Sequence, residues 1–245
     1  MIYMGSKSRI AKHILPIILK NRKDGQYYVE PFCGGCNTID KVDGNRIAND
    51  INKYLIAMWK FLVECKMDFP QIISKETYSY YRNMFYNRDC SDMTSDDAMI
   101  GWVGFMGSYN GRFFDGGYSG HSVKIKNGYR NYIGESIKNT LCQKDKLIGV
   151  CFLNKDYREL KLPPCCIIYC DPPYKGVKKY SYSIDHDEFW GWCRQKVNEG
   201  HKVFVSEYFA PNDFVCIWEQ ELKTAINQTI TKKAVERLFV HKSQI

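Results

Sequence analysis

The chain has 245 residues, of which 44% are hydrophobic and 15% are aromatic. This composition is sufficient for a packed core and excludes an intrinsically disordered protein. The net charge of +8 at pH 7 favours a polyanionic partner, although many basic proteins bind no nucleic acid. The length accommodates one large domain or one domain with an insertion.

Eleven cysteines, an odd number, are distributed over the whole chain. A secreted disulfide framework is therefore not expected, and free thiols in a reducing cytoplasm fit better. Cys33 and Cys36 have the spacing of half a zinc site, but no second Cys or His pair answers them, so we expect no metal. We expect neither a signal peptide nor a membrane partner, because no apolar run reaches membrane-spanning length.

The first predicted helix follows the segment Tyr3–Lys7. Isoleucines recur at helical spacing between positions 10 and 18, which predicts an apolar helix face with a kink at Pro16. Ser6 or Ser8 is the expected cap of this helix.

A strand, a glycine turn and the start of a helix are predicted over Tyr27–Asn37. Gly34 and Gly35 would let the backbone approach a ligand closely and leave helix-end N–H groups for an anionic group. Many nucleotide-binding folds contain such a turn, so this signal is weak alone.

Asp50 ends the next predicted strand, about 20 residues after the glycine turn begins, where a strand-end acid reaches ribose hydroxyls. The alternative role of Asp50 is to cap the helix that begins near Asn52, and the two roles are compatible. That helix is predicted to bury four apolar side chains at helical spacing, Leu55, Met58, Trp59 and Leu62.

The composition changes from about residue 69 onward. Helical stretches are predicted around Tyr78–Tyr86 and Ala98–Met106, beside a loop rich in Gly, Ser, Asn and Tyr over residues 107–120. We interpret this part as an inserted target-recognition region whose loop enters a nucleic-acid groove. The alternative is a helical lid with a solvated basic rim.

Four residues of this region suit contacts with DNA. Asn110 can bind adenine bidentately and Arg112 can bind guanine. Lys124 and Lys126 suit phosphate groups.

Two more strands are predicted, over Ile148–Leu153 and over Ile167–Cys170. The second is apolar and is followed directly by an acid, two prolines and an aromatic residue. A buried parallel strand that stops in this way leaves its last side chains in the crevice where open α/β sheets bind ligands. The alternative is an ordinary surface turn.

Each residue after this strand has a physical role. Asp171 can accept hydrogen bonds from an amino group, and Pro172 and Pro173 stiffen a backbone whose carbonyls can face a ligand. Tyr174 offers a flat face for stacking. Together these residues suit a planar heterocycle that is held by its ring and its exocyclic amine.

The remainder alternates between helix and strand. Lys175–Tyr180 could close over the base or hold the strand backbone, and the alternative is a mobile basic loop. Asp185–Glu199 is predicted to be a helix that stops at Gly200. Further strands are predicted at Lys202–Ser206 and Val215–Trp218.

The sequence resembles the Dam-type DNA adenine methyltransferases of the alpha group, which use S-adenosylmethionine. The resemblance is carried by Asp171-Pro172-Pro173-Tyr174, by the opening segment, by Glu30-Pro31-Phe32 with its glycine turn, and by the basic run from Lys232 before the last strand. Cys36 stands where many members have glycine, and the residues after Gly111 depart from the GATC-specific members, which leaves the recognition sequence open.

The resemblance implies that Asp171 and the Pro172 carbonyl hold the adenine amine and that Tyr174 stacks on the flipped base. It implies that residues from four parts of the chain bind the cofactor: Tyr3, Lys7, Pro31, Phe32, Gly34, Asp50 and Asp171. The expected activity is methyl transfer to the 6-amino nitrogen of adenine in double-stranded DNA, which yields S-adenosylhomocysteine.

The expected fold is α/β, a class I methyltransferase sheet of the Rossmann-like, doubly wound type with a helical insertion. Residues 1–68 and 141–245 would form the catalytic domain, and residues 69–140 the recognition insertion. We expect a monomer or a weak dimer on DNA, in the cytoplasm of a bacterial or phage-infected cell.

Three other functions are compatible with parts of the pattern. An RNA or protein amine methyltransferase would share the cofactor site, and a non-catalytic DNA-binding regulator would share the fold. A nicotinamide-dependent oxidoreductase is disfavoured, because the glycine turn lacks the full dinucleotide-binding spacing.

Overall fold

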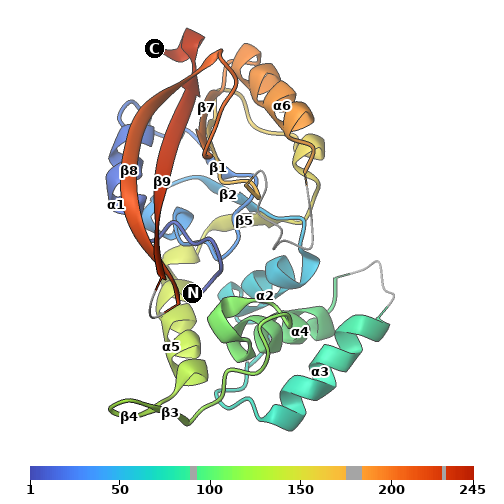
Figure 1. Ribbon diagram of the computed structural model, residues 1–245. Helices are drawn as coiled ribbons and strands as arrows, with labels where there is room; N and C mark the ends of the chain where they lie inside the picture. Colours follow the sequence, from blue (N-terminus) through green and yellow to red (C-terminus); the bar gives the residue numbers. More distant parts are fainter. Residues whose placement is uncertain (89–92, 175–183, 228–229) are drawn as a thin grey trace.

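A seven-stranded mixed sheet forms the centre of the computed structural model, which describes residues 1–88, 93–174, 184–227 and 230–245 (Figure 1). The first five strands in spatial order are parallel, and β9 runs antiparallel between β7 and β8. From edge to edge the strands are β5 (Val150–Leu153), β2 (Arg46–Asn49), β1 (Tyr28–Glu30), β6 (Ile167–Cys170), β7 (Lys202–Ser206), β9 (Ile230–His241) and β8 (Phe214–Asn227). The predicted doubly wound α/β sheet is confirmed.

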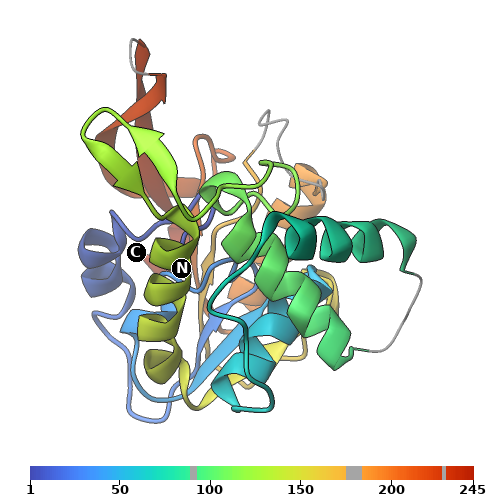
Figure 2. The same ribbon diagram turned by 90° about the horizontal axis from the view of Figure 1, so that it is seen from below.

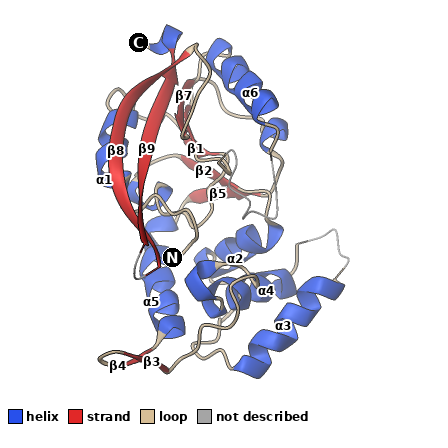
Figure 3. Ribbon diagram, in the orientation of Figure 1, coloured by secondary structure: helices blue, strands red, loops and turns tan. Residues whose placement is uncertain are grey.

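Helices cover both faces of this sheet (Figure 3). Side chains alternate across a strand, so Ile167 and Tyr169 of β6 enter one core, and Ile168 and Cys170 enter the other. The first core contains side chains of α1, α2, α4 and α5, and the second contains those of α6. The helices are α1 (Ala11–Ile18), α2 (Lys53–Val63), α3 (Lys75–Asn87), α4 (Ser95–Gly107), α5 (Tyr132–Lys144) and α6 (His186–Asn198).

Most predicted elements are present, and the carboxy-terminal strands are longer than predicted. β7 has the predicted bounds, and α6 ends before Gly200, whose φ is +89°. β8 and β9 pair with each other from Phe214 and His241 to Asn227 and Ile230, whereas β7 pairs only with the last part of β9. β8 and β9 can extend beyond β7 because their backbones form hydrogen bonds with each other. The predicted basic loop Lys175–Tyr180 lies outside the described residues.

Three local predictions about helix ends are wrong. The glycine turn leads into the short 3₁₀ helix Ile39–Lys41 instead of an α-helix. Helix α1 begins at Ala11, too far along the chain for Ser6 or Ser8 to cap it. Asn52, not Asp50, caps α2: its side chain accepts hydrogen bonds from the Tyr54 and Leu55 N–H groups, at 3.1 and 3.2 Å.

The predicted recognition insertion contains helix α4, which packs on α2. Helix α4 is buried nearly all round, and it approaches α2 so closely that a Cβ atom on Gly101 would lie 2.1 Å from the Tyr54 carbonyl oxygen. The insertion also contains a hairpin that was not predicted, formed by β3 (Val123–Ile125) and β4 (Gly128–Arg130), which leads directly into α5. Figure 2 shows this hairpin and the β8–β9 pair projecting from the same side of the molecule. The boundaries at residues 69 and 140 remain a prediction.

Candidate active site

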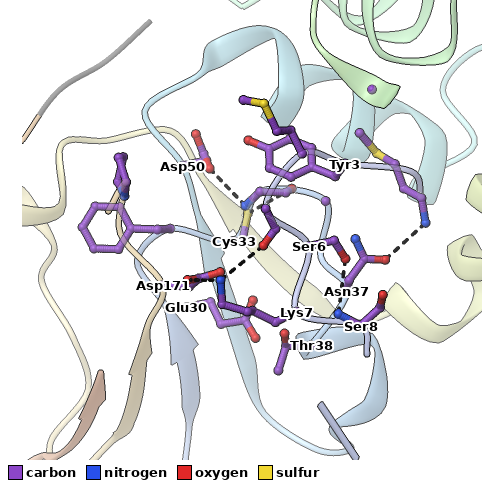
Figure 4. A pocket seen from close by; sticks show the side chains of 18 of the residues that line it. Tyr3, Ser6, Lys7, Ser8, Glu30, Cys33, Asn37, Thr38, Asp50 and Asp171 are labelled. Carbon is purple, nitrogen blue, oxygen red and sulfur yellow. Dashed lines mark hydrogen bonds and ion pairs between the residues drawn. The ribbon is translucent and has the colours of Figure 1, made fainter. Parts of the chain in front are cut away.

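A cavity of about 940 Å³ lies at the carboxyl ends of β1 and β6 (Figure 4). β2 and β5 lie on one side of β1, and β6 and β7 lie on the other. The direction in which successive strands are added therefore reverses between β1 and β6. Such a reversal opens a crevice in a doubly wound sheet, and ligands bind there. The topology therefore creates the cavity, and the segments that follow the strands form its walls.

The cavity brings together most of the site residues predicted from the sequence. Eight of the predicted catalytic and cofactor residues line it, namely Tyr3, Lys7, Phe32, Gly34, Asp50, Asp171, Pro172 and Tyr174. Pro31 does not: it is buried behind the wall, where its carbonyl accepts a hydrogen bond from Asn49 Nδ2 at 2.9 Å.

The glycine turn, residues 33–36, is tightly packed against Tyr3. Gly34 has a φ of +46°, and a Cβ atom there would lie 2.7 Å from Cε1 of Tyr3. Cys36, which stands where many Dam-type enzymes have glycine, also adopts a positive φ of +54°. A left-handed conformation costs a residue other than glycine about 1–2 kcal/mol. Cys36 thus adopts a left-handed backbone conformation that glycine usually supplies, although it carries a side chain.

Asp50 joins the end of β2 to this turn. One carboxylate oxygen accepts a hydrogen bond from the Gly34 N–H at 3.0 Å, and the other accepts one from the Asn52 N–H at 2.9 Å. Burial raises the pKa of Asp50, and the two N–H groups oppose this shift. The carboxylate is therefore fixed at the cavity wall by the backbone of two segments.

Gln143 supports the glycine turn from outside, and nothing in the sequence indicated this role. Its side chain, 4% exposed, donates from Nε2 to the carbonyl oxygens of Gly35 and Cys36, at 3.0 and 2.8 Å. Its Oε1 accepts a hydrogen bond from the amino group of Met1. A glutamine on an amphipathic helix such as α5 carries no local signal for a partner so distant in sequence.

Lys7 is placed against Asp171. The two charges lie 3.0 Å apart between Nζ and Oδ1, and Lys7 is 8% exposed (Figure 4). Nζ also contacts the Gly5 carbonyl at 3.3 Å and lies 4.4 Å from the centre of the Tyr174 ring. Lys7, a predicted cofactor-binding residue, is thus already part of a buried ion pair.

Asp171 carries a perturbed carboxyl group. Burial raises its pKa to about 6; the Lys7 ammonium opposes this shift, and the Glu236 and Glu207 carboxylates add to it. Glu30, 3% exposed, lies on the same wall and accepts a hydrogen bond from the Tyr28 hydroxyl at 2.9 Å. Burial raises the pKa of Glu30 well above its usual range, which favours its neutral form.

Tyr174 is anchored by its hydroxyl, which donates to Oε2 of Glu236 at 2.9 Å. Its ring meets the ring of Tyr208 edge-on, with centroids 4.6 Å apart and planes at 80°. Glu236 and Tyr208 both line the cavity. Sequence reasoning missed both residues, because they lie on segments more than thirty positions after Tyr174.

The predicted DNA-binding residues are not gathered at one point. Arg112 lines the cavity and pairs with Asp115, whereas Asn110 is exposed on the loop beside it with a φ of +54°. Lys124 and Lys126 are exposed on the β3–β4 hairpin. The loop approaches the amino-terminal segment so closely that a Cβ atom on Gly111 would lie 2.3 Å from the Ile2 carbonyl oxygen.

No group of three or more His, Cys, Asp or Glu side chains among the described residues could hold a metal ion. No helix within the described part of the chain has the length and apolar character to cross a membrane. Cys33 and Cys36 are both buried, and burial raises the pKa of each thiol.

The comparison with protein families agrees with the geometry. A family model described as D12 class N6 adenine-specific DNA methyltransferase matches residues 3–224, which include the glycine turn, Asp50 and Asp171-Pro172-Pro173-Tyr174. The match covers most of the chain, and the mostly parallel sheet is that of a class I methyltransferase. The predicted resemblance is confirmed: the chain belongs to the D12 class of N6 adenine-specific DNA methyltransferases.

Proposed function

We propose that this enzyme transfers a methyl group from S-adenosylmethionine to the 6-amino nitrogen of an adenine that has rotated out of duplex DNA. One observation carries the proposal: Asp171 and Tyr174 line the same cavity as the glycine turn and Asp50. The residues predicted to bind the base and those predicted to bind the cofactor therefore face one space.

The volume of the cavity, about 940 Å³, and the residues that line it support S-adenosylmethionine as the cofactor. When bound, this cofactor supplies the methyl group from a sulfonium centre, so that a neutral thioether leaves. Asp50 would hold the ribose hydroxyls, and the Tyr3 ring would face the sulfonium cation. The glycine turn would lie against the part of the cofactor between these two groups. Three acidic side chains along the wall, Asp50, Asp171 and Glu236, would complement a cationic ligand.

Asp171 and Pro172 would activate the amine. Two acceptors, the Asp171 carboxylate and the Pro172 carbonyl, would draw the amine hydrogens out of the ring plane and localise the nitrogen lone pair. That lone pair forms the new C–N bond while the electrons of the C–S bond leave with sulfur. The proton that the nitrogen then loses would pass to Asp171, whose pKa of about 6 suits a transient acceptor.

The recognition insertion, residues 69–140, would hold the DNA. Asn110 and Arg112 lie on the loop that borders the cavity, where they would contact bases beside the extruded adenine. Lys124 and Lys126 on the hairpin would contact phosphates, which position the duplex without reading its sequence. The enzyme would act as a monomer or a weak dimer on DNA.

Tritiated methyl transfer tests the proposal. The enzyme and labelled S-adenosylmethionine are incubated side by side with duplex DNA, RNA and protein, and label is expected in duplex DNA alone. Label in RNA or protein instead would favour the other amine methyltransferases, and no transfer at all would favour the non-catalytic regulator.

The variant Asp171→Ala tests the residue that carries the chemistry. Loss of one preorganised acceptor commonly costs about 3 kcal/mol, or about a hundredfold in rate. Methylation should therefore fall about a hundredfold or more, while binding of S-adenosylhomocysteine stays measurable by calorimetry. Near-normal turnover of the variant would show that Asp171 does not hold the amine.

A further inference from the structure

We propose that Glu236 is a positioning residue of the methyl-transfer site, which anchors the Tyr174 hydroxyl and receives Lys7 when the adenine amine occupies Asp171. This inference rests on the proposed function and assigns a role to a residue outside the range 3–224 that the family model matches. Glu236 lies on β9, opposite Gln220 of β8, and its side chain lines the cavity.

The contacts of Glu236 connect two groups of the site. Its Oε2 accepts the hydrogen bond of the Tyr174 hydroxyl at 2.9 Å and lies 3.7 Å from Nζ of Lys7. Lys7 in turn lies 3.0 Å from Oδ1 of Asp171. One ammonium group therefore stands between two carboxylates, nearer to Asp171 than to Glu236.

This arrangement gives Lys7 a second carboxylate partner in the proposed reaction. The adenine amine would donate to the Asp171 carboxylate beside Lys7, and an amine that takes Oδ1 would displace Lys7 from that oxygen. A buried ammonium that leaves its carboxylate needs another anion, because an unpaired buried charge is strongly destabilising. Glu236 is already within ion-pair distance, so Lys7 can change its main partner through a short movement of Nζ.

The second contact of Glu236 fixes the stacking surface. A tyrosine ring stacks productively only if its plane is held, and Tyr174 is held at its far end by this hydrogen bond and along its side by Tyr208. The ammonium of Lys7 lies 4.4 Å from the same ring. Glu236 thus governs both the ring and the cation next to it.

Asp171 responds to all the charges around it. The groups that face it from neighbouring elements are Lys7, Glu30, Tyr169, Cys170, Tyr174, Glu207, Tyr208 and Glu236. Removing the negative charge of Glu236 lowers the pKa of Asp171, both directly and because Lys7 then pairs with Asp171 alone.

The first test is the variant Glu236→Gln, measured by methyl transfer to a long PCR-amplified duplex over a range of pH. The plateau rate should fall about tenfold, less than the loss of a direct acceptor, because Lys7 stays on Asp171. The acid limb of kcat/KM should move to lower pH. The matched control is Glu219→Gln, on the exposed part of β8, where the wild-type carboxylate pairs with Arg237 at 3.1 Å; it should change neither quantity.

The second test separates the two contacts. An amide oxygen still accepts a hydrogen bond from the Tyr174 hydroxyl, whereas a methyl group does not. Glu236→Ala should therefore be slower than Glu236→Gln in the wild-type background and equal to it in the Tyr174→Phe background. Melting temperatures of all variants show whether any loss arises from unfolding, and the isosteric Gln variant keeps the test valid if the Ala variant does not fold.

The outcomes are distinct. Failure of the wild-type enzyme to methylate duplex DNA would overturn the proposed function itself. An active wild type with an unchanged plateau and acid limb in Glu236→Gln would overturn the role of Glu236 alone. A difference between the Ala and Gln variants that persists in the Tyr174→Phe background would show that the hydroxyl is not what Glu236 anchors.

Discussion

Asp171 is held between opposing influences. Burial and two nearby carboxylates favour its neutral form, whereas the ammonium of Lys7 favours the ionised form, and its pKa is about 6. A carboxyl group has to be ionised to accept hydrogen bonds with both oxygens. The ionised form of Asp171, which the reaction requires, therefore predominates only above about pH 6.

The pH dependence of kcat/KM follows from this balance. The carboxylate is lost as pH falls through the raised pKa, so activity should decline below about pH 6, well above the range of an ordinary aspartate near 3.9. Lys7→Met removes the opposing ammonium and should move this decline to higher pH in the residual activity. Methyl transfer measured from pH 5 to pH 9 with a wide-range buffer checks both, and a decline near pH 4 would contradict the assignment.

Tyr174 shows what a residue type can predict and what it cannot. Its ring is predicted to stack, a role that any aromatic side chain serves, and this role alone makes Tyr174→Phe a mild change. The structure adds a hydrogen bond from the hydroxyl to Glu236, a residue 62 positions later, which no local pattern announces. Loss of that bond alone costs about 0.5–1.5 kcal/mol, so Phe should still be far milder than Ala.

At the scale of elements, α5 connects the β3–β4 hairpin with the glycine turn. It starts two residues after β4, and near its end Gln143 donates to the carbonyls of Gly35 and Cys36. The shape of the glycine turn is thus set partly by a helix that belongs to the predicted recognition region for most of its length.

Gln143→Leu should weaken cofactor binding. The leucine fills a similar volume but leaves two backbone carbonyls of the glycine turn without their donor, and unsatisfied buried polar groups cost about 1–3 kcal/mol each. Calorimetry with S-adenosylhomocysteine should show a Kd about tenfold higher or more. Gln195→Leu on α6 is the matched control, because the side chain of this exposed glutamine donates to Glu199 at the end of its own helix. Equal affinities for both variants would remove Gln143 from the site.

The hairpin is the element that sequence patterns did not show. Its strands are three residues each and mostly exposed, so they lack the alternation of apolar and polar residues that predicts a strand. Strands β6 and β7 were predicted because they are apolar and buried in the parallel sheet. The helix predicted after the glycine turn was wrong for a similar reason. Ile39–Lys41 folds as a 3₁₀ helix, and no capping pattern in the sequence distinguishes it from the start of an α-helix.

Lys126→Ala tests the hairpin as a phosphate contact. One lost phosphate contact should weaken binding about equally for all duplex sequences and reduce the slope of log K against log salt by about 1. Lys20→Ala, at the end of α1 and away from the hairpin, should leave the slope unchanged. Fluorescence anisotropy at several salt concentrations measures it, and an unchanged slope in Lys126→Ala would favour the solvated basic rim.

Over the whole molecule, the sequence predicted the class of sheet and the order of the motifs, because each motif is a short local pattern. It did not predict which distant side chains complete the site. Gln143 and Gly35 are 108 positions apart, and they meet only because α5 returns to the sheet beside β1 and β2. Contacts of this kind depend on the packing of complete elements, so they have no signature within a window of residues.

The cavity joins segments from the whole chain, which predicts how a ligand affects global stability. Tyr3, Gly34, Asp50 and Asp171 reach one space from four separate segments, so unfolding of any of them dismantles the binding site. A ligand that binds only the folded state at 100 times its Kd adds about 2.7 kcal/mol, or about 5–10 °C in Tm for a chain of this size. S-adenosylhomocysteine should produce this shift in calorimetry, whereas NAD should produce none. Gly34→Ala should reduce the shift, because the added Cβ meets the Tyr3 ring, and Gly191→Ala, with no atom near its Cβ, should retain it. A shift with NAD alone would assign the glycine turn to a dinucleotide and separate the cavity from methyl transfer.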